Sequence, residues 1–228
     1  MSEDNLFVQP LFQMGPLSVT STVVTTWVIV GVLGLLGWLI SRRLRIEPGP
    51  LQTAVEGMVS AMEGAVSEVA PQHARLIMPF IGSLWVFLVV ANLSGLIPGV
   101  DSPTQDLSAT AALAIIVFVS THWFGIRTLG VKAYLRHYLS PSPILLPFHL
   151  ISEITRTIAL AVRLFGNMMS LQMAALLVLV VAGFLAPVPI LMLHIVEALV
   201  QAYIFGMLAL IYVAGGLQSQ QLRQQKKE

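Results

Sequence analysis

Apolar residues gather in five long runs along this chain, at 23–40, 76–97, 107–126, 144–185 and 190–217. The first three runs have about the length that a helix needs to cross the roughly 30 Å hydrocarbon core of a bilayer. The run 144–185 would form about 63 Å of helix at 1.5 Å per residue. We therefore predict that the last two helices are strongly tilted, bent or partly outside lipid.

The segment 51–69 has a different pattern, in which apolar and acidic residues alternate at helical spacing. Glu56 and Glu63 are seven residues apart and therefore share one face of a helix. This pattern predicts an amphipathic helix at the inner membrane surface, and a soluble helix that contacts a partner subunit is an open alternative. We expect residues 1–20, which are polar and mixed, to lie outside the membrane, with at most a short interfacial piece at 11–14.

Basic residues mark the ends of three apolar runs. They are Arg42, Arg43 and Arg45 after the first run, Arg127, Lys132 and Arg136 after the third, and Arg223, Lys226 and Lys227 after the last. The loop 100–106 is acidic and has no basic residue. Because basic loops remain in the cytoplasm, the sequence predicts an external N-terminus, a cytoplasmic C-terminus and one membrane domain over 1–228.

The composition is that of an all-α membrane protein. Of the 228 residues 56% are hydrophobic and 10% are charged, against about 25% charged in soluble domains. The net charge of +1 gives no reason to expect nucleic-acid binding. The absence of cysteine excludes disulfides and thiolate metal sites, and the five histidines lack metal-binding spacing. We predict no metal, no cofactor and, without a phosphate-binding loop, no ATP site in this chain.

One positive charge, Arg163, lies inside the fourth apolar run, and no other charged residue occurs between it and Glu197. Arginine cannot lose its proton, and at a helix centre it costs about 2.5–3.5 kcal/mol on insertion scales. Such a residue faces a partner or a water-filled cavity and is a candidate functional residue. The alternative is a structural arginine that extends to the membrane interface.

Other polar residues accompany this arginine at helical spacing. One face holds Glu153, Arg156, Arg163 and Asn167 on the fourth run, and another holds His194, Glu197 and Gln201 on the fifth. We call these two rows of residues the polar stripes of the fourth and fifth runs. In lipid they must face protein or water. They could face each other or another chain, and a network that only joins two helices is the structural alternative.

The charge balance of the two stripes leaves Arg163 without a fixed partner. Glu153 can pair with Arg156, and we expect Glu197 to be protonated or to pair with His194. No carboxylate occurs in the turns next to Arg163. A positive charge without a fixed partner suits a transient one, supplied by another chain.

Several short motifs in the chain are distinctive. They are RLFGNM at 163–168, PVP at 187–189, the His194 to Gln201 spacing with QAYIF at 201–205, NLSGLIP at 92–98 and PTxDLSxT at 103–110. Together they resemble subunit a of the bacterial F-type ATP synthase, over most of the chain from about residue 75 onward. The resemblance implies a non-catalytic stator subunit in the bacterial inner membrane. It would hold two offset ion half-channels against a rotating c-ring of small hairpin subunits, each with an essential carboxylate, beside subunit b of the peripheral stalk and the remainder of the complex.

The resemblance also assigns roles to residues of this chain. Arg163 matches the family's essential arginine, Asn167 its neighbour in the motif, Gln201 the glutamine that packs near that arginine, and His194 a position that lines the outer half-channel. Two positions depart from the pattern of many members, which have acids where this chain has His149 and Gln172. Glu153 and Glu197 are our candidates to replace them.

We therefore assign ion translocation to Arg163, Asn167, Gln201, His194, Glu197, Gln172, Glu153 and Arg156. We expect H⁺ as the coupling ion, with Na⁺ as the alternative. A stand-alone secondary transporter is the rival hypothesis, although the repeats that it requires are not visible in the sequence.

Overall fold

The computed structural model describes residues 10–14, 17–97, 99–131, 134, 146–183 and 186–224, and it confirms an all-α membrane fold. Its helices are α1 (Ser21–Arg42), α2 (Pro50–Val69), α3 (Ala74–Ser94), α4 (Leu107–Leu129), α6 (Leu146–Ala182) and α7 (Val188–Gln224), with the 3₁₀ turn η2 (Pro103–Gln105) before α4. Two short strands, β1 (Pro10–Met14) and β2 (Leu17–Thr20), pair antiparallel ahead of α1. This hairpin was not predicted from the sequence, although Leu17–Thr20 alternates apolar and polar residues.

Five of the helices are long and apolar enough to cross a membrane, as predicted. These segments are Ser21–Arg42, Ala74–Ser94, Leu107–Thr128, Pro147–Ala182 and Val188–Leu217. The main difference lies at the end of α6, which stops before the predicted residue 185. Gly183 adopts a φ of +84°, and its N–H donates to the Leu179 carbonyl at 3.1 Å. This left-handed glycine closes the helix; residues 184–185 lie outside the described residues.

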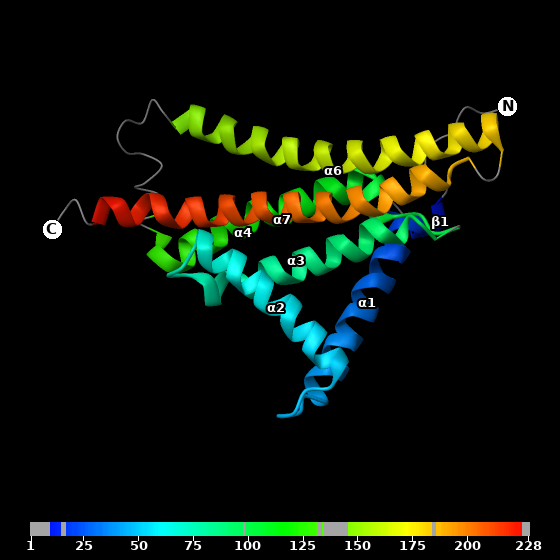
Figure 1. Cartoon of the computed structure of the whole chain (residues 1–228). Helices are drawn as coiled ribbons and strands as arrows, with labels where there is room; N and C mark the ends of the chain where they lie inside the picture. Colours follow the sequence, from blue (N-terminus) through cyan, green and yellow to red (C-terminus); the bar gives the residue numbers. More distant parts are fainter. Residues whose placement is uncertain are drawn as a thin grey trace.

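The long helix α7 lies in the middle of the bundle, where it contacts α3, α4 and α6 (Figure 1). The helices α6 and α7 run antiparallel, and α4 also packs against α6. On the other side of α3, α1 and α2 diverge as a V. Because α1 buries only Thr22 and Ile29, most of its apolar surface is open to lipid or to another chain.

Small residues on α7 explain its central position. Ala198, Ala202 and Ala209 are fully buried. Gly206 lies against the indole ring of Trp85 on α3, so that a Cβ at position 206 would overlap the ring. The Trp85 Nε1–H donates to the carbonyl of Tyr203 at 3.4 Å. Small residues allow helix backbones to approach closely in membranes, and they do so here between α3 and α7.

The segment between α3 and α4 folds back onto the end of α3. The Ser102 hydroxyl donates to the Ala91 carbonyl at 2.6 Å, and it is 2.9 Å from the hydroxyl of Thr104. Asp106 caps α4 by accepting a hydrogen bond from the Ser108 N–H at 2.8 Å. These contacts fix a polar end of the bundle next to the start of α7.

The predicted amphipathic helix is present as α2 and packs against α3 and α7. Val66 is its fully buried residue, whereas Glu56 and Glu63 are exposed. One face of α2 therefore packs on the bundle and the acidic face is open. Its position at the inner membrane surface stays a prediction.

Candidate ion-translocation site

The two polar stripes meet at one hydrogen bond between α6 and α7. The Asn167 Nδ2–H donates to Gln201 Oε1 at 2.7 Å. Gln201 is only 2% exposed, and its Nε2 has no hydrogen-bond partner among the described residues. A buried amide nitrogen without a partner requires water or another ligand. The structure thus joins two of the predicted site residues and leaves a donor available beside them.

Arg163 is exposed on α6, one turn before Asn167. Leu164, the next residue, is fully buried, so the helix presents its core face and Arg163 on different sides. Within the described part of the chain, Arg163 makes no ion pair, hydrogen bond or cation–π contact. Its guanidinium is therefore without a fixed partner among the described residues, and a transient partner from another chain stays a prediction.

A second polar region surrounds the first half of α7. The Asn92 Nδ2–H of α3 donates to the Ala198 carbonyl at 2.9 Å, between His194 and Gln201 on the same helix. His194 is only 4% exposed. Neither its Nε2 nor Asn92 Oδ1 has a hydrogen-bond partner in the described segments. Buried polar atoms without partners require water or another ligand.

Glu197 and Gln172 take less defined positions. Glu197 is partly exposed, and no ion pair joins it to His194 among the described residues, so that expected pairing is wrong. Its place on the helix, between His194 and Gln201, keeps it beside the second polar region. Gln172 is partly exposed on α6, and no described hydrogen bond connects it with the other site residues.

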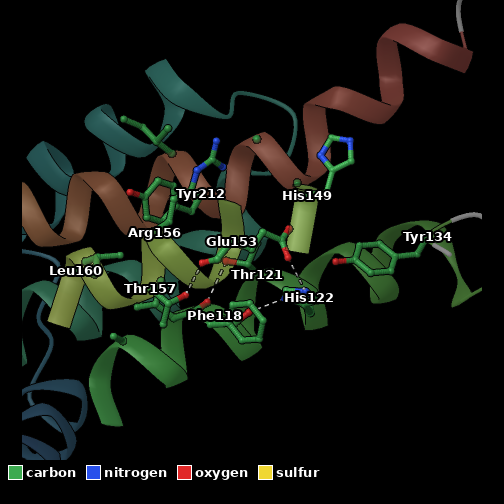
Figure 2. Close-up of a pocket in the computed structure, with 15 residues that line it drawn as sticks. Phe118, Thr121, His122, Tyr134, His149, Glu153, Arg156, Thr157, Leu160 and Tyr212 are labelled. Carbon is green, nitrogen blue, oxygen red and sulfur yellow. Dashed lines mark hydrogen bonds and ion pairs between the residues drawn. The ribbon is translucent and has the colours of Figure 1, made fainter. Parts of the chain in front are cut away.

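A cavity of about 450 Å³ lies between α4, α6 and α7 (Figure 2). It lies at the Glu153 end of the polar stripe on α6. His149, Glu153 and Arg156 of α6 line it, together with His122 of α4 and Tyr212 of α7. Its walls thus combine charged, titratable and aromatic side chains. On α4 the cavity is lined by residues between 114 and 122, and the last turn of the same helix bears Arg127.

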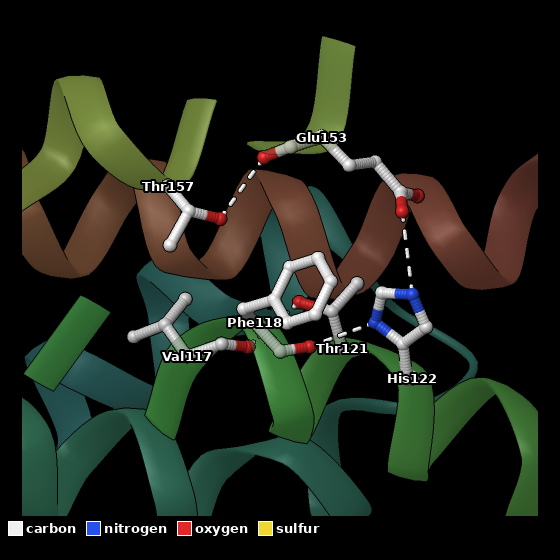
Figure 3. A network of polar contacts seen from close by, with 6 residues as sticks. All are labelled: Val117, Phe118, Thr121, His122, Glu153 and Thr157. Carbon is white, nitrogen blue, oxygen red and sulfur yellow. Dashed lines mark hydrogen bonds and ion pairs between the residues drawn. The ribbon is translucent and has the colours of Figure 1, made fainter. Parts of the chain in front are cut away.

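The ion pair in this cavity is not the predicted one. Glu153 Oε2 lies 3.2 Å from His122 Nε2 (Figure 3), whereas the Arg156 guanidinium lies over the Tyr212 ring, with Cζ 5.6 Å from its centroid. Spacing by three residues permits a Glu153–Arg156 contact, but α4 places His122 opposite Glu153. The expected Glu153–Arg156 pair is therefore wrong.

Sequence reasoning missed His122 as a member of the site. A signal existed, because this histidine lies within an apolar run and next to its basic end. The sequence could not show that α4 packs on α6 at this level. His122 Nδ1 is also 2.8 Å from the Phe118 carbonyl oxygen, which orients the ring toward Glu153 (Figure 3).

The fold and these buried polar residues define a multi-pass membrane protein with an ionisable site between its longest helices. The family model described as ATP synthase A chain matches residues 23–214. The chain belongs to this family of membrane-sector subunits of the ATP synthase, which confirms the resemblance to subunit a.

Relatives match along nearly the whole chain. The chain is 66% identical over 220 residues to ATP synthase subunit a 2 of Pelobacter propionicus, covering 96% of each protein. It is 63% identical over 205 residues to ATP synthase subunit a 1 of Hahella chejuensis, covering 90% of this chain and 87% of the relative. It is 55% identical over 226 residues to ATP synthase subunit a of Legionella pneumophila, covering 99% and 98%.

Proposed function

We propose that this chain is the non-catalytic stator subunit that couples ion movement to rotation of a c-ring in a bacterial inner membrane. The observation that carries the proposal is the exposed Arg163, which has no partner among the described residues and lies one turn from the part-buried Asn167–Gln201 hydrogen bond. Polar regions lie on both sides of this point, at His194 and at Glu153. The remainder of the complex, including subunit b, would hold the chain against the ring.

The two polar regions support two offset half-channels. Along α7, His194 precedes Gln201 by seven residues, or about 10 Å at the helical rise. Along α6, Glu153 precedes Asn167 by fourteen residues, or about 21 Å. Since α6 and α7 are antiparallel, these regions extend in opposite directions from the Asn167–Gln201 bond. An ion that enters one region can then leave by the other only after passing Arg163.

Arg163 separates the half-channels by its charge. An ionised ring carboxylate at 4 Å from the guanidinium gains about 4 kcal/mol at an effective dielectric of 20. It cannot enter lipid while charged, but it can do so after an ion from one half-channel has neutralised it. The ion must then travel with the ring. The membrane potential supplies about 2.3 kcal/mol per charge per 100 mV.

The direction of the half-channels follows from the basic residues. Arg127 lies in the last turn of α4, beyond the part of this helix that lines the cavity with Glu153, and the positive-inside rule places this end of α4 in the cytoplasm; we therefore infer that the cavity opens to the cytoplasm. The region at His194 opens to the outside. The N-terminus is then external and the C-terminus cytoplasmic, and we propose H⁺ as the coupling ion.

Reconstitution of the whole complex in vesicles tests this function. Arg163→Ala should assemble, because removal of a costly charge need not destabilise its helix, and it should abolish ion-driven ATP synthesis. Arg163→Lys should also abolish ion-driven ATP synthesis, because lysine lacks the planar guanidinium group and the very high pKa of arginine. The control Arg75→Ala removes an exposed charge at the start of α3 and should keep the parent rate. Synthesis by Arg163→Ala near the parent rate, or ion transport by the chain alone, would contradict the proposal.

A further inference from the structure

We propose that His122 and Glu153 form a proton-exchange site in the wall of the cavity between α4, α6 and α7, which passes protons from the ring carboxylate near Arg163 to the cytoplasm during ATP synthesis. This inference rests on the proposed stator function, and it adds a residue and a role that the arginine mechanism does not require. The ligand of the site is a proton, held between an imidazole nitrogen and a carboxylate oxygen.

The geometry of the pair requires it to hold a proton. His122 Nδ1 faces the Phe118 carbonyl oxygen at 2.8 Å, and Nε2 faces Glu153 Oε2 at 3.2 Å. A carbonyl can only accept a hydrogen bond, and an ionised carboxylate can only accept as well. Either both ring nitrogens carry hydrogen beside an ionised Glu153, or a neutral ring accepts from a protonated Glu153. Both arrangements share one proton between Nε2 and Oε2.

The pair borders the cavity, with the carboxylate oxygen of the contact turned away from bulk water. The two side chains are 27% and 23% exposed, whereas Glu153 Oε2, the oxygen that faces the His122 ring, is buried. Among the described residues, the other titratable or charged groups that line the cavity are His149 and Arg156 from α6, Tyr212 from α7, and Tyr134. Arg156 lies over Tyr212 rather than on the carboxylate.

The cavity also connects the pair with the level of Arg163. Its lining continues along α6 from Glu153 through Thr157 to Leu160, and Leu160 is within one turn of Arg163. The pair is about 15 Å from Arg163 along the helix, a distance that water in the cavity would bridge. Figure 2 shows Glu153, Thr157 and Leu160 among the side chains that line this cavity.

The proton balance of one exchange is simple. During synthesis the pair with one proton accepts a second, through cavity water, from the protonated ring carboxylate, which is left ionised near Arg163. The pair then holds an imidazolium and a neutral carboxyl group. Loss of one proton to cavity water on the cytoplasmic side, which forms hydronium, returns the pair to its first state. One proton enters and one leaves, so that no other reactant is needed.

A structural alternative is that the pair only holds α4 against α6. The variants His122→Gln and Glu153→Gln separate the two roles, because an amide can still make a hydrogen bond between the helices but cannot exchange a proton near neutral pH. Both are made in the complete complex, and the amount of assembled complex is measured. His73→Gln and Glu63→Gln are matched controls, since they make the same changes away from the cavity, at the start of α3 and on α2.

The readout is ATP synthesis as a function of pH on the cytoplasmic side. We expect each variant to lose roughly 10²-fold in rate, the lower end of what a positioned acid–base group contributes, and to lose the parent's pH dependence. The double variant should lose no more than either single one, because the two residues act as a unit. Glu153→Asp, which keeps a titrating carboxyl on a shorter side chain, should assemble and show an altered pH profile with a smaller loss.

Several results would overturn the exchange site. One is parent-like rates and pH profiles in both glutamine variants, with Arg163→Ala still inactive; the stator function would then stand without the pair. If the glutamine variants do not assemble, Glu153→Asp decides the matter. A dependence of its ATP synthesis on cytoplasmic pH that equals the parent's would also overturn the exchange site. A parent rate that follows Na⁺ and not pH also excludes the site. Synthesis by Arg163→Ala near the parent rate instead contradicts the stator function itself.

Discussion

The contact of Gly206 with Trp85 allows a sharp test of the bundle. In Gly206→Ala the new Cβ would overlap the indole ring, and Trp85 is only 5% exposed, so its ring has little room to move. Gly31→Ala is the matched control. Gly31 also lies inside a spanning helix, α1, but a Cβ there would meet nothing within 4 Å.

The comparison isolates the contact because both changes replace glycine with alanine in a helix. Both gain roughly 1 kcal/mol in helix propensity, and this gain cancels in the difference. Overpacking costs about 1–3 kcal/mol, and loss of the Trp85–Tyr203 hydrogen bond costs about 1 kcal/mol more. We therefore expect Gly206→Ala to be less stable than Gly31→Ala by about 2–4 kcal/mol.

Unfolding of the purified chain in mixed micelles, with a denaturing detergent as titrant, measures this difference. Adding Trp85→Phe to Gly206→Ala should recover part of the lost free energy of unfolding, because the smaller ring leaves room for the methyl group. Equal stability of the two alanine variants, or no recovery with Trp85→Phe, would refute the packing of α3 on α7 described here.

Three further predictions concern the polar residues and the topology. Asn167→Ala should lower the free energy of unfolding by about 1–3 kcal/mol, because it leaves a buried Gln201 oxygen without its donor. Adding Gln201→Leu should recover part of this loss in the same detergent titration. If the losses of the two single variants simply add in the double variant, the contact is contradicted. Glu197→Gln should slow ion-driven synthesis with assembly intact, and unchanged rates at every pH would remove Glu197 from the path. Asp101→Cys should react with an impermeant thiol reagent from outside and Thr128→Cys from inside; reaction of both from one side excludes the proposed topology.

The helices themselves could be predicted from the sequence, because apolar runs and basic ends are local properties of the chain. The five spans and the cap at Asp106 all follow from residues close to one another in sequence. Two local features were missed, the β1–β2 hairpin and the stop at Gly183. Gly183 was overlooked because apolar residues continue past it.

The site could be predicted only in part, because spacing along one helix does not say which helix lies opposite. The polar faces of α6 and α7 follow from helical spacing, and Asn167 and Gln201 do contact each other. The partner of Glu153 could not be derived in this way. Spacing favours Arg156, whereas the packing of α4 on α6 brings His122 to the carboxylate.

Passive ion flux tests the central claim, that Arg163 separates the two half-channels. The measurement uses vesicles with the membrane sector in place and the catalytic head removed, under an imposed membrane potential. We predict that flux through Arg163→Ala rises above that of the parent and of Arg75→Ala, because no charge then favours ionisation of the passing carboxylate or blocks direct passage. Equal flux in all three would contradict the account.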